Sequence, residues 1–208
     1  MAISVIRTAT NNANSSTPNV TIDATGGNAL VICYSAVSYD VPALTFNGAS
    51  LTTAVSNNAG DYRHAGIAYI LNPSQGSYSC SGTTATSATW KMFAIVLSGV
   101  KSSSPLGNQN NNANLDQSFT TSTANSIIID SFSADNTDIL TGPDSGQTGI
   151  GSVLFQFSHY GGASYRIATS VGAYNMGWTY GASIWFHVIQ EFKEEPAAAS
   201  NPGMLMMF

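Results

Sequence analysis

The stretch ALVICYSAVSY, residues 29–39, decides the fold class of this chain. It places apolar side chains on both faces of an extended strand, with Leu30 on one face and Val31 on the other. Because strand side chains alternate between the two faces of a sheet, a strand that is apolar on both faces must be covered on both. WKMFAIVLSGV at 90–100 and ASIWFHVIQEF at 182–192 have the same pattern. We expect these central strands to be covered on one side by a sandwich core, and on the other by loops or a neighbouring subunit.

Short strand-like runs recur along the rest of the chain, each bounded by Gly, Asn, Pro or Ser. This spacing is typical of a sandwich or barrel, and no segment keeps the apolar period of about 3.6 residues that marks a helix. Charged residues make up 8% of the chain, against about 25% in ordinary soluble domains. Small polar residues that suit strands and turns take their place. The sequence therefore predicts an all-β protein, an antiparallel β-sandwich. Its expected strands are 2–9, 29–39, 43–47, 50–55, 62–71, 76–82, 88–100, 115–121, 125–133, 150–158, 164–169, 173–179 and 182–193.

The chain is expected to form one β-sandwich domain over residues 1–193, followed by an extended C-terminal tail at 194–208. Within the domain, KSSSPLGNQNNNAN at 101–114 is rich in Ser and Asn and offers little for a packed core, so we expect a long loop. After the domain, EEPAAASNPG contains Pro196 and Pro202, which disfavour both helix and sheet pairing. This stretch is expected to act as a tether.

The chain ends in five large apolar residues, and such a terminus requires a surface to cover it. Met adapts to irregular grooves, and Phe supplies a large anchor. We expect this segment to dock on a neighbouring subunit of an assembly; the alternative is that it folds back on its own sandwich. The partner-docking residues are Met204, Leu205, Met206, Met207 and Phe208.

Charge and composition exclude several classes of function. A net charge of −5 with six scattered basic residues offers no positive surface for a nucleic-acid backbone, which needs clustered Lys and Arg. No stretch approaches the length of a membrane span, and the N-terminal MAISVIRTATNNANSS has no apolar run behind a basic start. We therefore expect no nucleic-acid or membrane partner, and folding in the cytoplasm. Cys33 and Cys80, both in strand-like segments, are expected to be free thiols.

Standard catalytic motifs are absent from the sequence. It contains no Gly-x-Ser-x-Gly, Gly-x-x-x-x-Gly-Lys or His-Glu-x-x-His string. His64, His159 and His187 are far apart, and none has a second His or Cys within four residues. A histidine acts in catalysis only when it is paired with other functional groups. We therefore expect structural histidines, no metal, no cofactor and no enzyme activity.

Three aspartates in SADNTDILTGPDSG, Asp135, Asp138 and Asp144, raise two alternatives. Carboxylates in a turn could collect calcium, but these fit no calcium-loop spacing, and Asp commonly hydrogen-bonds its own backbone in turns. Paired carboxylates could also form a glycosidase, yet no spacing in the sequence indicates that two of them converge. We expect turn residues at these positions.

Aromatic residues gather near glycines in HYGGASYR at 159–166 and AYNMGWTYG at 173–181. Exposed rings of this kind can stack on sugars, which makes this the best candidate patch for a glycan. The alternative, which we favour, is that Trp178 and some of the tyrosines fill the core or a subunit interface with their polar tips outward. The candidate ligand-binding residues are Tyr160, Tyr165, Tyr174, Trp178 and Tyr180.

Turn and packing motifs along the chain resemble a jelly-roll-like β-sandwich module of bacteriophage virion proteins and bacterial extracellular proteins. The motifs are Asn47-Gly48 with Leu51-Thr52, Tyr69 to Pro73 with Gly76, and Ser98 to Val100 with Pro105 to Gly107. The resemblance covers 29–107 and 182–193 and implies a fold more than a chemistry. Asn47-Gly48 also predicts, on its own, a two-residue turn with positive φ at both centres.

The absence of an export signal favours the virion members of that family. The resemblance therefore implies a non-enzymatic virion structural protein, a capsid decoration or cement protein that assembles in the host cytoplasm. Its expected partners are other virion proteins, chiefly the major capsid protein, and further copies of itself in a homo-oligomer such as a trimer. The alternative is a carbohydrate- or receptor-binding module of a tail or fibre protein.

Overall fold

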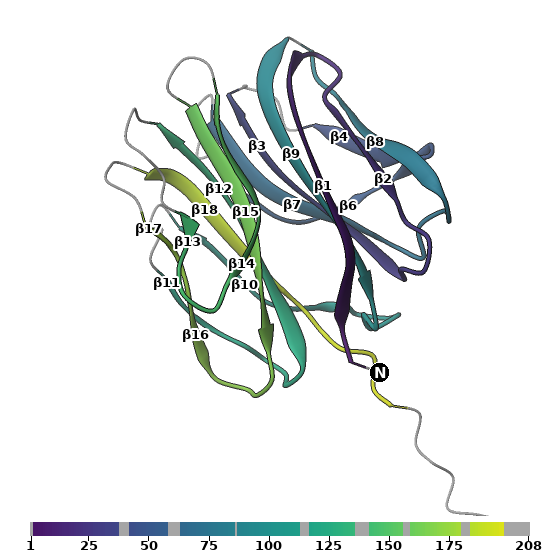
Figure 1. Ribbon diagram of the computed structural model, residues 1–208, viewed down its shortest axis with the longest axis vertical. Coiled ribbons are helices and arrows are strands. Elements are labelled where there is room, and N and C mark those ends of the chain that lie inside the picture. The colour runs from purple at the N-terminus through teal and green to yellow at the C-terminus, as the bar shows by residue number, and fades with distance from the viewer. Residues whose placement is uncertain are drawn as a thin grey trace, which may run out of the picture.

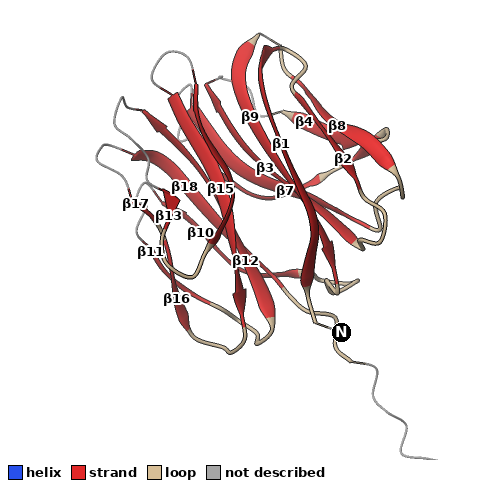
Figure 2. Ribbon diagram, viewed as in Figure 1, coloured by secondary structure: helices blue, strands red, loops and turns tan. Residues whose placement is uncertain are grey.

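The computed structural model describes residues 2–37, 42–57, 63–85, 87–112, 117–135, 142–155, 159–179 and 184–197. Within these ranges the chain forms antiparallel strands in five sheets, and Figure 2 shows strands joined by loops throughout. The prediction of an all-β protein is confirmed. Among the described residues there is no helix long and apolar enough to cross a membrane.

The first half of the chain forms a five-stranded main sheet and a four-stranded cover sheet. The first main sheet has the order β1 (Ser4–Ser15), β9 (Ala88–Ser98), β3 (Ala29–Val37), β7 (Arg63–Leu71) and β6 (Thr52–Asn57). The cover sheet has the order β2 (Asn19–Asp23), β8 (Ser77–Thr83), β4 (Ala43–Phe46) and β5 (Ala49–Ser50).

The second half forms another five-stranded main sheet and two short strand pairs. The second main sheet has the order β10 (Leu106–Asn112), β18 (Ile184–Phe192), β12 (Ser126–Asp135), β15 (His159–Ala168) and β14 (Thr148–Phe155). The pairs, here called the cover strands, are β11 (Gln117–Thr120) with β16 (Ala173–Met176), and β13 (Gly142–Pro143) with β17 (Trp178–Thr179).

The two main sheets repeat the same strand order. In each, the first strand of the half lies at one edge, the last strand of the half lies beside it, and the third strand is central. The sheets face each other with β1 against β14, β9 against β15, β3 against β12, β7 against β18 and β6 against β10. The edge strand β1 of the first sheet thus faces the opposite edge strand of the second, β14, and β6 faces β10. Such reciprocal contacts are those of a two-fold interface. Figure 1 shows the main sheets face to face, with the cover sheet and the cover strands outside them.

Apolar clusters fill the spaces between these layers. One cluster lies between the main sheets, where Cys33, Phe93 and Ile95 meet Ile129 and Val188. A second lies between the first main sheet and the cover sheet. It contains Val20, Ile22, Leu30, Ile32, Tyr34, Phe46, Cys80, Trp90 and Met92. The central strands are thus covered on both faces as predicted, but the second cover belongs to the same chain rather than to loops or a neighbouring subunit.

Three strands were not predicted, namely β2, β10 and β13. The expected loop at 101–114 is wrong over Leu106–Asn112, which forms β10. Its Asn-rich sequence has low strand propensity, but the strand lies at a sheet edge where its polar side chains reach solvent. Pairing with β18, for example Asn110 opposite Ile189, supplies the ladder that the local sequence does not indicate.

The turn at Asn47-Gly48 is as predicted. Both residues have positive φ, 47° at Asn47 and 79° at Gly48, and the flanking Phe46 and Ala49 form a strand pair. Cys33 and Cys80 are buried free thiols, also as predicted, and they lie in different apolar clusters.

The segment after the last strand runs beside the junction between the halves. Val100 and Glu194 form a bridge, the Lys101 N–H donates to the Lys193 carbonyl at 2.8 Å, and the Glu195 N–H donates to the Gly99 carbonyl at 2.8 Å. Ala197 is the last residue that the structure describes. The predicted docking segment, Met204 to Phe208, therefore lies outside the described residues and stays a prediction.

Candidate functional site

The most polar group in the interior is centred on Asp130, in β12 on the face that meets the cover strands. Its side chain has no solvent exposure. The Ser164 N–H and hydroxyl both donate to Oδ1 at 2.7 Å, the Trp178 indole N–H donates to Oδ2 at 2.8 Å, and His187 Nε2 lies 3.0 Å from Oδ2. These four close donors come from three strands, and Gln147 Nε2 adds a longer contact, 3.5 Å from Oδ2.

His187 extends this group toward the edge of the sheet. Its Nδ1 lies 3.1 Å from Gln117 Nε2, and the oxygen of that amide accepts from Asn110 Nδ2. Because Gln117 presents its N–H₂ to the ring, Nδ1 accepts, and Nε2 carries the proton that is donated to Asp130. The chain of bonds thus runs in one direction, from Asn110 through Gln117 and His187 to Asp130.

Gln147, in the loop between β13 and β14, connects the same group to the loop between β16 and β17. Its Nε2 donates to the Ser164 hydroxyl at 2.6 Å, and its Oε1 accepts from the Gly177 N–H at 2.8 Å. Asp130, Ser164 and His187 all have no exposed surface. This group therefore attaches the cover strands to the second main sheet, which agrees with the structural role expected for His187.

Glu191 forms a second buried carboxylate site, on β18. It accepts from the Ser122 N–H at 2.8 Å, the Asn108 N–H at 2.9 Å and the Thr123 N–H at 3.1 Å. Burial raises the pKa of this carboxyl, but the backbone donors outweigh burial, and the pKa is lowered from its ordinary value. A Cβ on Gly107 would lie 2.1 Å from Glu191 Oε2, so the backbone approaches this closely only because residue 107 is glycine.

The sequence missed both carboxylates, although it contained a signal for them. Asp130 and Glu191 interrupt apolar strands, in IIIDSF and VIQEF. A charged residue in a strand that is buried on both faces must find partners there. The identity of those partners depends on sheet order, which the sequence alone did not provide.

The five aromatic residues considered for a glycan do not form one exposed platform. Tyr160 and Trp178 are only 6% and 4% exposed and pack with Phe132 in the interior. Tyr165 packs against the cluster between the main sheets, and the Tyr174 hydroxyl donates to the Ser170 carbonyl at 2.9 Å. Tyr180 lies outside the described residues. Tyr160 and Trp178 therefore present no ring face to a sugar, which agrees with the core placement favoured above.

Only some of the three aspartates considered for calcium lie within the described residues. Asp138 lies outside it, and Asp144 occupies a turn in which its carbonyl accepts the Gln147 N–H at 3.1 Å. Across the described part of the chain, no three His, Cys, Asp or Glu side chains are grouped closely enough to hold a metal ion.

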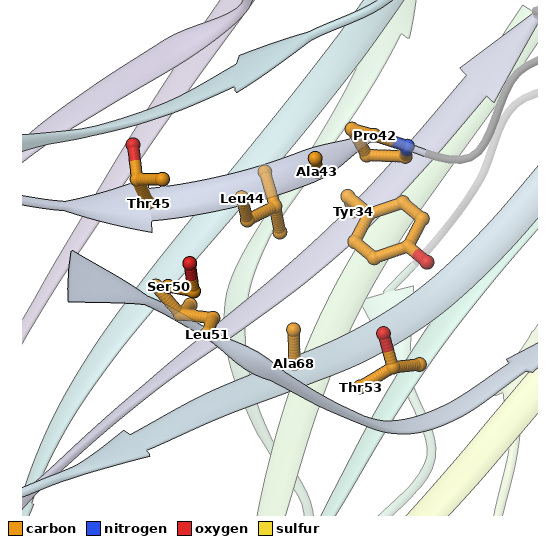
Figure 3. Close-up of a pocket in the computed structure, with 9 residues that line it drawn as sticks. All are labelled: Tyr34, Pro42, Ala43, Leu44, Thr45, Ser50, Leu51, Thr53 and Ala68. Carbon is orange, nitrogen blue, oxygen red and sulfur yellow. The ribbon is translucent and has the colours of Figure 1, made fainter. Parts of the chain in front are cut away.

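A small cavity of about 130 Å³ lies on the outer side of the first main sheet, beside the β4–β5 hairpin. Figure 3 shows Leu44 and Tyr34 on one side of the space, with Leu51 and Thr53 on the other. None of the described residues that line it is charged. The lining residues are Tyr34, Pro42, Ala43, Leu44, Thr45, Ser50, Leu51, Thr53 and Ala68.

Tyr34 forms a rigid wall of this cavity. A Cβ on Gly66 would lie 2.2 Å from Tyr34 Cζ, and the Trp90 ring lies 6.3 Å away between centroids. Burial raises the pKa of Tyr34 to about 12, so its hydroxyl is neutral at physiological pH. This is the cavity we consider as a ligand site.

Comparison with known proteins adds no relative. No family model matches the chain, and no curated protein or solved structure matches it.

Proposed function

We propose that the protein is a non-enzymatic structural protein of a bacteriophage virion, a capsid decoration or cement protein, and that each half is a jelly roll. The strand order carries the proposal. An eight-stranded jelly roll has two four-stranded sheets, and viral capsid domains commonly use this fold. The orders β1-β9-β3-β7 and β2-β8-β4-β5 fit that arrangement, and the second main sheet repeats the first of them.

The interior polar groups also support a structural role. Asp130 is held by donors from three strands, Glu191 is held by donors from β10 and from the loop between β11 and β12, and both are closed to solvent. Such groups fix the positions of strands; they do not act on a ligand. The protein would then stabilise a shell by rigid contact with its neighbours.

The proposed attachment is made by the C-terminal apolar segment. Met204 to Phe208, which lie outside the described residues, would dock on the major capsid protein. Burying one such side chain contributes about 1.5–3 kcal/mol before the cost of ordering. Repetition over a symmetric homo-oligomer, such as a trimer, would multiply this effect.

Quantitative mass spectrometry of purified particles tests the location. Hundreds of copies per particle are expected for a decoration protein, whereas a handful would place the protein in the tail and overturn the capsid assignment. Absence from particles would overturn the virion proposal itself.

A second experiment tests the docking segment. A chain with all five residues from Met204 to Phe208 replaced by Ser keeps its length, and we expect it to fold but not to enter particles. The matched control replaces the three alanines of the tether, residues 197–199, by Ser and should be incorporated normally. Normal incorporation of the first variant would contradict the docking role.

A further inference from the structure

The cavity beside the β4–β5 hairpin arises from the way the chain changes sheets. β5 has two residues in the cover sheet, and the next strand, β6, already belongs to the main sheet. Leu51 lies at this crossing, where its N–H donates to the Leu44 carbonyl at 2.9 Å. The cover sheet is therefore short at this edge, and a space remains above Ala68.

The cavity is built from rigid parts. Tyr34 is fixed by the backbone of Gly66 and by Trp90, and the hairpin is fixed by the two-residue turn at Asn47-Gly48. A site that is already formed loses little entropy when it binds a ligand.

The lining combines hydroxyl groups with apolar surface. Thr45, Ser50 and Thr53 carry hydroxyls, and Leu44, Leu51 and the buried ring of Tyr34 supply apolar walls. Figure 3 shows the Thr53 hydroxyl pointing across the space toward Tyr34. Hydroxyls both donate and accept hydrogen bonds, so they suit a ligand that carries hydroxyls itself. A charged ligand would find no opposite charge among these residues.

The size of the space limits the ligand to one ring. A cavity of about 150 Å³ lined by apolar side chains holds a benzene molecule, and this one measures about 130 Å³. A sugar ring is larger than benzene, so it would enter with one edge and leave the rest outside, and a second ring would not fit. We propose that the cavity binds a single neutral, hydroxyl-bearing six-membered ring, such as the terminal sugar of a glycan. This inference stands independently of the proposed virion role, because it rests on the cavity alone.

Titration of the full chain with neutral methyl pyranosides, followed by backbone amide NMR, tests the proposal. We expect shifts confined to β3, β4, β5, β6 and β7, with a dissociation constant of about 1 mM or weaker. The corresponding sugar acid should bind more weakly. Absence of shifts with every neutral pyranoside, or equal binding of the sugar acid, would overturn the proposal.

Two variants of the hairpin locate the site. Ser50 lines the cavity, whereas its exposed neighbour Ala49 does not. Ser50→Trp should abolish binding by closing the opening, and Ala49→Trp, a matched change on the same strand, should leave binding within twofold of the parent. Thr53→Val, which keeps the shape and removes one hydroxyl, should weaken binding several-fold. Binding that survives both Ser50→Trp and Thr53→Val would place the ligand elsewhere and contradict the assignment.

Discussion

The two halves of the molecule share a strand order but hold their outer layers by different means. In the first half, the cover sheet packs on the main sheet through a large apolar cluster that includes Ile32, Phe46 and Trp90. In the second half, the apolar clusters that the described residues form under the cover strands are small, and two buried carboxylates, Asp130 and Glu191, bind backbone and side-chain donors. One topology can therefore be stabilised either by non-directional burial or by directional hydrogen bonds.

The largest loss of stability is expected when the buried carboxylate of Asp130 is removed. Asp130→Ala leaves the Trp178 indole and His187 without their buried acceptor and should lower the free energy of unfolding by about 3–5 kcal/mol. Urea unfolding followed by circular dichroism measures this. The control is Asp23→Ala in the first half, where the carboxylate is exposed and lies 3.4 Å from Arg7. The control should lower the free energy of unfolding far less, because solvent screens an exposed ion pair, and equal losses would show that the buried carboxylate does not hold the second half.

The interface between the halves contains a buried lysine with its own pH dependence. Lys91 has no exposed surface, its Cδ would lie 3.1 Å from a Cβ on Gly161 of the other main sheet, and burial lowers its pKa to about 7. Between pH 7 and pH 10 the unfolded chain keeps a proton that the folded chain has lost, so stability should rise with pH. This group contributes at most about 1.4 kcal/mol per pH unit.

The variant Lys91→Met removes that titration. Its urea midpoint, measured at pH 7 and at pH 10, should rise less between the two than the midpoint of the parent. Lys101→Met, which changes a less buried lysine, is the control. Parallel pH profiles for the parent and Lys91→Met would contradict the lowered pKa.

The contribution of Glu191 to the stability of the second half should depend on pH. Its folded-state pKa is lowered from 4.5, so its stabilising effect is present above that value and is lost as the pH falls through the folded pKa. Glu191→Gln should therefore cost about 1.5–3 kcal/mol at pH 7. The difference from the parent should shrink at pH 4 and below, as measured by unfolding at both pH values. A difference that stays constant with pH would show that charge at residue 191 contributes nothing.

The smallest effect is expected in the apolar cluster of the first half. Ile32→Val removes one buried methylene-sized group and should lower the free energy of unfolding by about 0.5–1.5 kcal/mol. Unlike Glu191→Gln, this loss should be the same at pH 4 and pH 7. A pH-dependent loss would break the distinction between the two halves.

Much of the fold could be predicted because the central strands carry their signal locally. β3, β9 and β18 are apolar on both faces, and the Asn47-Gly48 turn requires residues that accept positive φ. The strands β2 and β10 were not predicted, because NVTID is short and LGNQNNN is polar. Both segments form strands by pairing with neighbours that are distant in sequence. Strand order is a property of such long-range pairs.

The candidate sites were harder to predict for the same reason. Asp130 and Trp178 are 48 residues apart, and their hydrogen bond exists only because β12 and β17 lie in adjacent layers. The cavity depends on the point where the chain crosses between sheets at Leu51, which no motif marks. Residue type favoured the core for Trp178, but the role of Asp130, its partners and the cavity were not predicted.

Because the two packed main sheets belong to one chain, their interface does not depend on protein concentration, and their sequences can diverge. Between separate chains, an interface of this kind weakens as the concentration falls. Here residues 99–105 join the two faces, so each meets the other at a fixed effective concentration, however dilute the protein is. The two faces are also encoded separately and need not stay identical. A covalently joined pair can therefore keep an outer layer held by apolar packing on one side and an outer layer held by buried hydrogen bonds on the other, a division that identical subunits cannot make.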